Sequence, residues 1–163
     1  MTTALMLLLG IVLTAGTFVF VSAEFSLVAV DQAVLDKKAE EGDRGAASVL
    51  RATRSLSTQL SGAQVGITLT TILLGYTTQS ALAELLEDLL GSVGLAWGLA
   101  TGIAAFVAAA FINVFSMLFG ELVPKNLALA HPLATAVRVV PFQMVFTAIT
   151  RPLIWVLGGT ANW

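Results

Sequence analysis

The residues with the most chemistry stand at the end of a long apolar run, where Gly120 and Glu121 are followed by Pro124 and Lys125. Ionisable side chains are costly at membrane depth and usually serve a function there. Proline has no N–H, and its ring clashes with the carbonyl four residues earlier in a helix, which here belongs to Gly120. The sequence therefore predicts a freed carbonyl oxygen beside the Glu121 carboxylate. Two hard oxygen donors of this kind suit a hard cation.

An alternative interpretation of the same residues requires no ion. Pro124 can simply kink a helix where it leaves the membrane, and Glu121 and Lys125 are four residues apart, the spacing at which opposite charges pair on a helix. The two interpretations predict different partners for the Glu121 carboxylate, a metal ion or the lysine ammonium.

A second group of oxygen donors lies near the end of the first apolar run, at Ser22, Glu24 and Ser26. At about 100° per residue the two serines share one helix face, while Glu24 points nearly opposite. Each serine could instead bond the carbonyl one turn back, as hydroxyls in membrane helices often do. Glu24 could extend toward the membrane surface, or pair with Lys125 or with an arginine of the following segment.

Thr68 and Thr71 add hydroxyls three residues apart in the next apolar segment, and the same backbone-bonding alternative applies to them. All three groups supply oxygen and none supplies nitrogen or sulfur. Such a ligand set suits magnesium, calcium or sodium and argues against zinc or copper. The chain has no cysteine, so disulfides and thiolate metal sites are excluded. His131 is the single histidine, and we expect it in a loop without a role.

The composition identifies the elements that must position these residues as membrane helices. Hydrophobic residues make up 57% of the 163 and charged residues only 11%, far below the roughly 25% of soluble domains. The run from Ala4 to Val30 contains one charge and exceeds the roughly 20 residues needed to cross a bilayer. It lacks a basic start and a small-residue cleavage site, so we expect a retained helix and not a signal peptide.

The middle of the chain alternates polar and apolar segments. Residues 31–61 hold five basic and five acidic residues, which predicts a helical linker at the membrane surface. The apolar run Val65–Tyr76 is too short to span, so we expect it to recruit residues 60–64 and to break near Gly62 and Gly66. Residues 77–94 carry three acids and no base, which predicts a loop on the opposite side of the membrane.

The run Leu95–Phe119 predicts a third span rich in small residues. Gly98 and Gly102 form a GxxxG pattern, and Ala105 and Ala109 continue the spacing. Such faces allow close helix contact and favour a homodimer, although small residues are also common in membrane helices without that role.

Residues 133–157 are apolar but are interrupted by two arginines and two prolines. Charges at the bilayer centre cost at least about 2.5 kcal/mol each, so we expect a bent juxtamembrane helix at the interface. Three spans then place all eight Lys and Arg residues on one side, which the positive-inside rule identifies as the cytoplasm. The predicted fold is an all-α membrane protein with three transmembrane helices, the second short and broken, with the N-terminus outside and the C-terminus cytoplasmic.

Three stretches together resemble the membrane domain of the cyclin M/CorC magnesium transporter family, whose bacterial members are often labelled hemolysin-like. They are FVSAEFSLVAV at 20–30, QVGITLTTILLG at 64–75 and FGELVPKNLAL at 119–129. The resemblance covers nearly the whole chain in the expected order. It implies a homodimer of three-span subunits in the plasma (inner) membrane, with a magnesium ion held between helices in a cavity open to the cytoplasm.

Carried over residue by residue, the resemblance implies metal ligands on all three spans. They are Ser22, Ser26, Thr68, Thr71, Gly120 and Glu121. Family members usually continue into a CBS pair, which binds nucleotide, and a small C-terminal domain. This chain stops at Trp163, so we expect residues 1–163 to be a single transmembrane domain of a longer protein.

The resulting hypothesis is a magnesium transporter, not an enzyme, that exports the ion by alternating access and has no nucleic-acid partner. Sodium coupling extends the resemblance and rests on no particular residue. The alternative hypothesis is a membrane anchor and dimerisation module for the missing cytoplasmic domains. Ion binding by the isolated chain separates the two. A pore-forming toxin is disfavoured, because the chain has no secretion signal.

Overall fold

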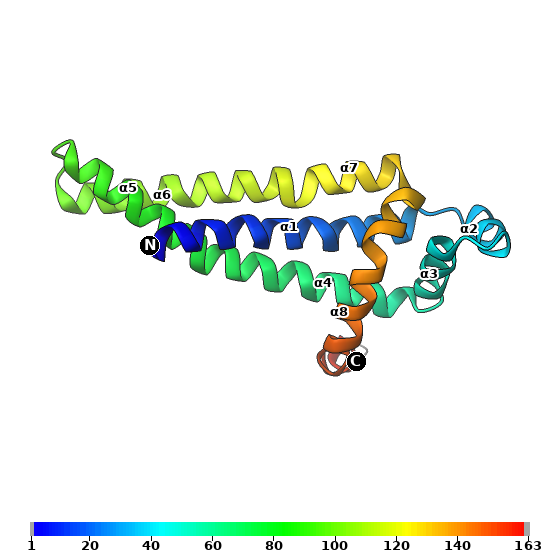
Figure 1. The fold of residues 1–163 in the computed structure, drawn as a ribbon. Helices are drawn as coiled ribbons and strands as arrows, with labels where there is room; N and C mark the ends of the chain where they lie inside the picture. The colour runs from blue at the N-terminus through cyan, green and yellow to red at the C-terminus, as the bar shows by residue number, and fades with distance from the viewer. Residues whose placement is uncertain (1, 162–163) are drawn as a thin grey trace.

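The computed structural model describes the backbone of residues 2–161 and the side chains of residues 3–156. This part of the chain is helical throughout and contains no strand (Figure 1). The elements in order are α1 Thr2–Ala29, α2 Gln32–Glu40, α3 Arg44–Thr53, α4 Leu56–Leu74, the π-helix η1 Gly75–Gln79, α5 Ser80–Ser92, α6 Trp97–Phe115, the π-helix η2 Ser116–Leu122, α7 Val123–Ala130 and α8 Pro132–Ala161.

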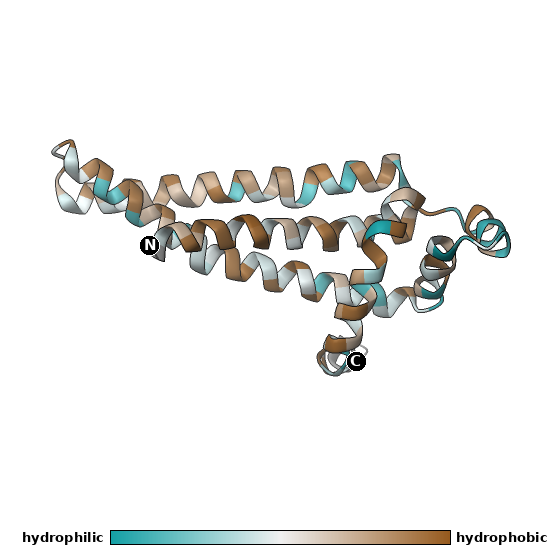
Figure 2. Ribbon diagram, in the orientation of Figure 1, coloured by the Kyte–Doolittle hydropathy of each residue, from teal (hydrophilic) through white to brown (hydrophobic). Residues whose placement is uncertain are grey.

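Helix α1 lies at the centre of the bundle, with α4 on one side and the continuous helix α6–η2–α7 on the other (Figure 1). Close packing depends on glycine. A Cβ on Gly66 would lie 2.7 Å from the ring of Phe20, and one on Gly10 would lie 2.5 Å from Thr78. Many large apolar side chains are exposed along this bundle. Hydrophilic residues gather at α2–α3 and along parts of α5 (Figure 2). The prediction of an all-α membrane protein is confirmed.

Three helices are long and apolar enough to cross a membrane: Thr3–Ala29, Trp97–Ala130 and Pro132–Val156. The first two cover all but one or two end residues of the predicted spans 4–30 and 95–119. The second continues past Phe119 to Ala130, because η2 and α7 carry the helix on. Helix α4 is outside this group because its glutamines and hydroxyl residues lower its hydropathy. Its position alongside α1 nevertheless makes it the middle helix of a three-helix bundle (Figure 1).

The predicted break near Gly62 and Gly66 is wrong. Helix α4 passes through both glycines and continues through η1 into α5 without interruption up to Ser92. The glycines serve as contact points, because Gly62 faces Thr147 of α8 and Gly66 faces Phe20 of α1. Close packing at both positions offsets the roughly 1 kcal/mol that glycine costs in a helix. The irregular segment is the π-helix η1, which begins at Gly75 after both glycines.

The segment 77–94, predicted as a loop, is also mostly helical. Helix α5 packs antiparallel to α6, and the turn between them includes Gly94 at φ +87°. Thr101 of α6 donates a 2.6 Å hydrogen bond to the Glu87 carboxylate of α5. Leu82 packs against the buried cluster of Leu13, Leu74 and Ile112, which anchors this hairpin to the bundle. The acidic residues therefore lie on a helix and not in an open loop.

Helix α8 crosses the bundle transversely at the end that carries α2 and α3 (Figure 1). It is apolar enough to span, but it contacts α1, α3 and α4 along its length and contains Pro141 and Pro152. Its inner face joins a core with the end of α1 and with α3, including Ala136, Val140, Val49 and Leu27. This arrangement agrees with the predicted juxtamembrane helix better than with a fourth span.

Candidate metal site

Ser22 and Ser26 lie on the same face of α1 and are fully buried, as the helical period predicts. The Ser26 hydroxyl donates a 3.3 Å hydrogen bond to the carbonyl of Ala23. The Ser22 Oγ is buried and has no hydrogen-bond partner within the described part of the chain. A buried hydroxyl without a partner costs about 1–3 kcal/mol, so Ser22 is the serine with capacity for a ligand.

Glu24 points away from the two serines and is half-buried, as expected. Its carboxylate lies beside the side chain of Gln64 on α4. Gln64, Thr68 and Thr71 share one face of α4, because they are four and three residues apart. The acid of α1 that reaches the hydroxyl-bearing face of α4 is therefore Glu24, and the serines face elsewhere.

Thr68 and Thr71 are exposed in the single chain. The Thr71 hydroxyl donates to the carbonyl of Ile67 at 2.7 Å, the backbone bond that the alternative interpretation expects. The structure thus does not bring these two threonines to Ser22 and Ser26. The predicted ligands are distributed over buried and exposed faces of three helices.

The π-helix η2 gives the Gly120 carbonyl an unusual position. The backbone N–H of Val123 donates to the Leu118 carbonyl, in the wider π register, and residue 124 is proline. Gly120 would receive its α-helical bond from residue 124, which has no N–H. Gly120 thus lacks its α-helical donor for the covalent reason that the sequence predicted, and η2 adds a π segment that the sequence did not predict. π segments of this kind often accompany functional sites.

Gly120 is buried against α1, whereas the Glu121 side chain is exposed. A Cβ on Gly120 would lie 3.4 Å from both Ser116 Oγ and Thr17 Cγ2. The Thr17 and Thr70 hydroxyl oxygens are 2.7 Å apart. Thr17 of α1 therefore contacts both neighbouring helices: its hydroxyl faces Thr70 of α4, and its methyl group faces Gly120 of η2.

Sequence reasoning missed Thr17, Thr70 and Ser116. A usable signal for Thr70 was its spacing from Gly62 and Gly66, since the three residues recur every four positions and mark the face of α4 that packs inward. Thr68 and Thr71 lie on the opposite, exposed face of α4. Thr17 had no comparable signal, because its importance depends on which helix face meets η2.

Lys125 does not pair with Glu121 among the described side chains. Its ammonium lies 4.8 Å from the centroid of the Phe25 ring, at cation–π distance. The ion-pair interpretation of Glu121 and Lys125 is therefore wrong for this conformation. The carboxylate keeps its coordination capacity.

The donor set near η2 consists of hydroxyls, a carbonyl and a single carboxylate. Among the described residues no group of three His, Cys, Asp or Glu side chains could hold a metal ion. A cation site at this position would therefore neutralise only a small part of the charge of the ion. Weak binding of this kind is compatible with release of the ion.

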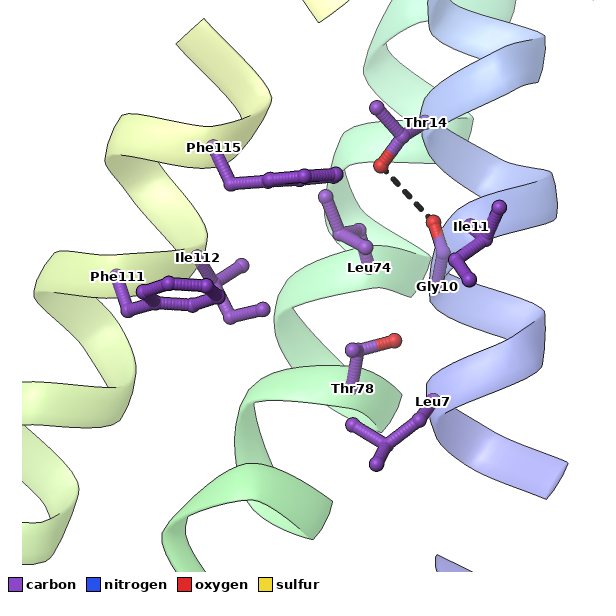
Figure 3. A pocket seen from close by; sticks show the side chains of 9 residues that line it. All are labelled: Leu7, Gly10, Ile11, Thr14, Leu74, Thr78, Phe111, Ile112 and Phe115. Carbon is purple, nitrogen blue, oxygen red and sulfur yellow. Dashed lines mark hydrogen bonds between the residues drawn. The ribbon is translucent and has the colours of Figure 1, made fainter. Parts of the chain in front are cut away.

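An apolar cavity of about 240 Å³ lies between α1, η1 and α6, toward the opposite end of the bundle (Figure 3). Its two threonines both use their hydroxyls on backbone carbonyls: Thr14 donates to Gly10 at 2.9 Å, and Thr78 donates to Met6 at 3.1 Å. Phe111 and Phe115 form the facing wall. This cavity lacks a free polar ligand and is not the cation site.

Curated relatives match nearly the whole chain. It is 45% identical over 151 residues to the UPF0053 protein MT1890 of Mycobacterium tuberculosis, covering 93% of this chain and 33% of that protein. It is 33% identical to the UPF0053 protein YhdP of Bacillus subtilis, covering 96% and 35%, and 32% identical to the UPF0053 protein sll0260 of Synechocystis, covering 88% and 32%. The chain thus spans about a third of the length of these relatives.

The description of the matching family agrees with the fold. The Cyclin M transmembrane N-terminal domain matches residues 8–163, which include most of α1, the continuous helix α4–η1–α5, the continuous helix α6–η2–α7 and α8. The match extends over nearly the whole chain and includes every candidate ligand described above. This chain therefore belongs to the cyclin M transmembrane-domain family.

Proposed function

We propose that this chain is the membrane domain of a magnesium transporter and that it binds the ion between α1, α4 and η2. The observation that carries the proposal is the π segment followed by Pro124, which leaves the buried Gly120 without an α-helical donor beside the Glu121 carboxylate. Magnesium prefers about six oxygen ligands at roughly 2.0–2.1 Å and retains several waters. One carboxylate, one carbonyl and a few hydroxyls fit that preference.

Each predicted ligand has a place in this scheme. Glu121 supplies the charge and Gly120 a carbonyl oxygen, while Ser22 supplies a buried hydroxyl that lacks another partner. Ser26, Thr68 and Thr71 now bond backbone carbonyls or face outward, so they would join the site only after α1 and α4 move relative to η2. We propose that this movement is the alternating-access step.

The two π-helices support a moving bundle. A π segment has one more residue per hydrogen-bonded ring than an α-helix and can convert to α by a shift in register. η1 and η2 both contact α1. A register shift in either would rotate the following helix, α5 or α7, and change which oxygens face α1.

The proposed orientation follows the distribution of charge. Basic residues lie on α2, α3, α7 and α8. The charged residues of α5 are all acidic. We propose that the end of the bundle with α2, α3 and α8 faces the cytoplasm of a plasma (inner) membrane, with the N-terminus outside. Export, sodium coupling and homodimer formation are further parts of the proposal, and the last rests on the open face of α6 around Gly98 and Gly102.

Calorimetric titration of the purified chain with magnesium, sodium and calcium tests the proposal. We expect saturable magnesium binding that Glu121→Gln abolishes, while helix content and thermal stability are kept. Glu84→Gln removes an exposed carboxylate on α5, at the far end of the bundle, and serves as the matched control. If the parent chain binds no magnesium, the domain is a membrane anchor and dimerisation module. That second function accords with a chain that spans a third of its relatives.

A further inference from the structure

Helix α8 has two opposite faces, and both are largely uncharged. The inner face is buried, with Val140, Gln143 and Thr147 at 0–3% exposure. The outer face carries large apolar side chains every three or four residues. They are Phe142, Val145, Ile149 and Leu153, with exposed fractions of 55%, 60%, 73% and 49%. An apolar stripe of this kind indicates a partner or an apolar surrounding.

The contacts on the two flanks of α8 show where this helix lies along the bundle. On one flank Val137 meets Gly45 of α3, and the Ser48 hydroxyl lies 4.0 Å from the Met144 sulfur. On the other flank the ring of Phe146 lies 4.6 Å from that of Phe20, inside the first span. α8 therefore lies at the boundary between the polar end of the molecule and its apolar bundle (Figure 2).

Two exposed arginines accompany this stripe. Arg138 stands one helical turn before Phe142 on the outer face, and Arg151 stands one turn before Trp155 on the flank that Met144 shares. Trp155 is 80% exposed, and tryptophan is enriched at membrane interfaces. Residues 132–156 contain no acidic side chain. The outer face of α8 is thus apolar with Arg138 near its start, and Arg151 lies on the flank; the charged side chains of residues 132–156 are all positive.

We propose that α8 lies in the bilayer interface with its outer face toward lipid, and that it selects anionic phospholipids through Arg138 on that face and Arg151 on the flank. The stripe from Phe142 to Leu153 occupies the boundary between headgroups and acyl chains, as amphipathic interfacial helices do. The guanidinium groups bind lipid phosphate by paired, charge-assisted hydrogen bonds. This inference stands independently of magnesium transport.

A second copy of the chain fits this surface poorly. A two-fold contact brings the same patch of both subunits together, so arginines would approach arginines. No carboxylate on α8 is available to neutralise them. A bilayer with anionic headgroups supplies both the apolar surroundings and the missing charge.

Fluorescence quenching of Trp155 tests the proposal in the full chain. Trp97→Phe and Trp163→Phe leave Trp155 as the single tryptophan, and the protein is reconstituted in bilayers that contain brominated phosphatidylglycerol or brominated phosphatidylcholine. We expect the anionic lipid to quench more strongly, with a relative association constant that falls about fivefold for each of Arg138→Gln and Arg151→Gln. Arg151→Lys should retain only part of the preference, because lysine keeps the positive charge but cannot form the paired hydrogen bonds of a guanidinium.

Lys38→Gln on α2 removes one exposed positive charge away from α8 and should leave the preference unchanged. Equal quenching by the two lipids in the parent protein would overturn the proposal, as would glutamine variants that keep the parent's preference. Protection of Trp155 from both lipids would also overturn it and would place a second copy over the stripe. Loss of magnesium binding in the same samples would bear on the proposed function alone.

Discussion

The Ser22 hydroxyl is a buried polar group whose position no hydrogen bond among the described residues explains. It is fully buried on α1 and has no hydrogen-bond partner in the described part of the chain, whereas the neighbouring Ser26 hydroxyl bonds the Ala23 carbonyl. Natural proteins contain few buried polar atoms without partners, and each one calls for an explanation. Coordination of a cation is such an explanation.

Ser22→Ala should therefore leave thermal stability unchanged or slightly raised, because it removes a buried polar atom that bonds nothing. At the same time we expect magnesium affinity to fall several-fold in calorimetric titration. Ser26→Ala is the comparison for stability alone, which it should lower slightly through the lost 3.3 Å hydrogen bond. A Ser22→Ala protein that is clearly less stable would assign the hydroxyl a structural role.

Two glycines on α4 allow close contact with the neighbouring helices. Gly62 admits Thr147 of α8, and Gly66 admits Phe20 of α1. Gln143 of α8 strengthens the first contact, since its amide donates 3.0 Å hydrogen bonds to the Gln59 carbonyl and to the Thr147 hydroxyl. The crossing of α4 and α8 is therefore a tight contact with a buried polar centre.

Gly62→Ala should destabilise this crossing by about 1–3 kcal/mol, the usual range for overpacking. A Cβ there would lie 3.0 Å from the Thr147 Cβ, too close without a shift of α8. Thermal unfolding in detergent measures the effect. Gly98→Ala places the same methyl group in open space and should be neutral or stabilising. Equal stabilities of the two variants would mean that α8 moves freely against α4.

Pro124 acts through the helix that contains it. Pro124→Ala restores an N–H that can donate to the Gly120 carbonyl, so we expect η2 to convert toward an α-helix and magnesium affinity to fall by about tenfold or more. The change alters no charge. Unchanged affinity in calorimetric titration would show that the carbonyl is not a ligand.

The whole molecule is asymmetric in charge along the bundle axis, with its bases at the α2, α3 and α8 end and acids alone on α5. This asymmetry predicts the topology. A cysteine at Ser92, beside the α5–α6 turn, should react with an impermeant reagent in intact cells. A cysteine at Lys38 on α2 should react only after permeabilisation. Both positions are exposed, and the chain has no cysteine of its own, so labelling is specific. The opposite pattern would invert the orientation.

Homodimer formation is a second property of the whole molecule that can be tested. Within the subunit α6 packs through Ala100, Ala104 and Ala108, and Gly98 and Gly102 face open space. Gly102→Leu should therefore leave the subunit folded and weaken a homodimer that uses this face. Mass measurement in detergent checks the result, with Val107→Leu as a control for added bulk on an exposed position. An unchanged dimer would place the interface elsewhere.

Several features were determined by the sequence alone. Apolar length and the scarcity of charge define α1 and α6 as spans, because backbone groups in lipid must be satisfied within a helix. Helical period places Ser22 and Ser26 together and Glu24 apart, and the structure confirms both. The missing N–H of Pro124 follows from covalent chemistry and needs no fold.

Tertiary structure decided the remaining features. Whether Gly62 breaks a helix or admits a neighbour depends on Thr147, which is 85 positions away in the chain, and local propensity carries no information about that contact. The same holds for Thr70, which reaches Thr17 while Thr68 and Thr71 point outward. The π register of η2 and the transverse course of α8 also arise from packing between helices. Sequence determines which residues can share a helix face, and only the packed bundle decides which face meets a partner.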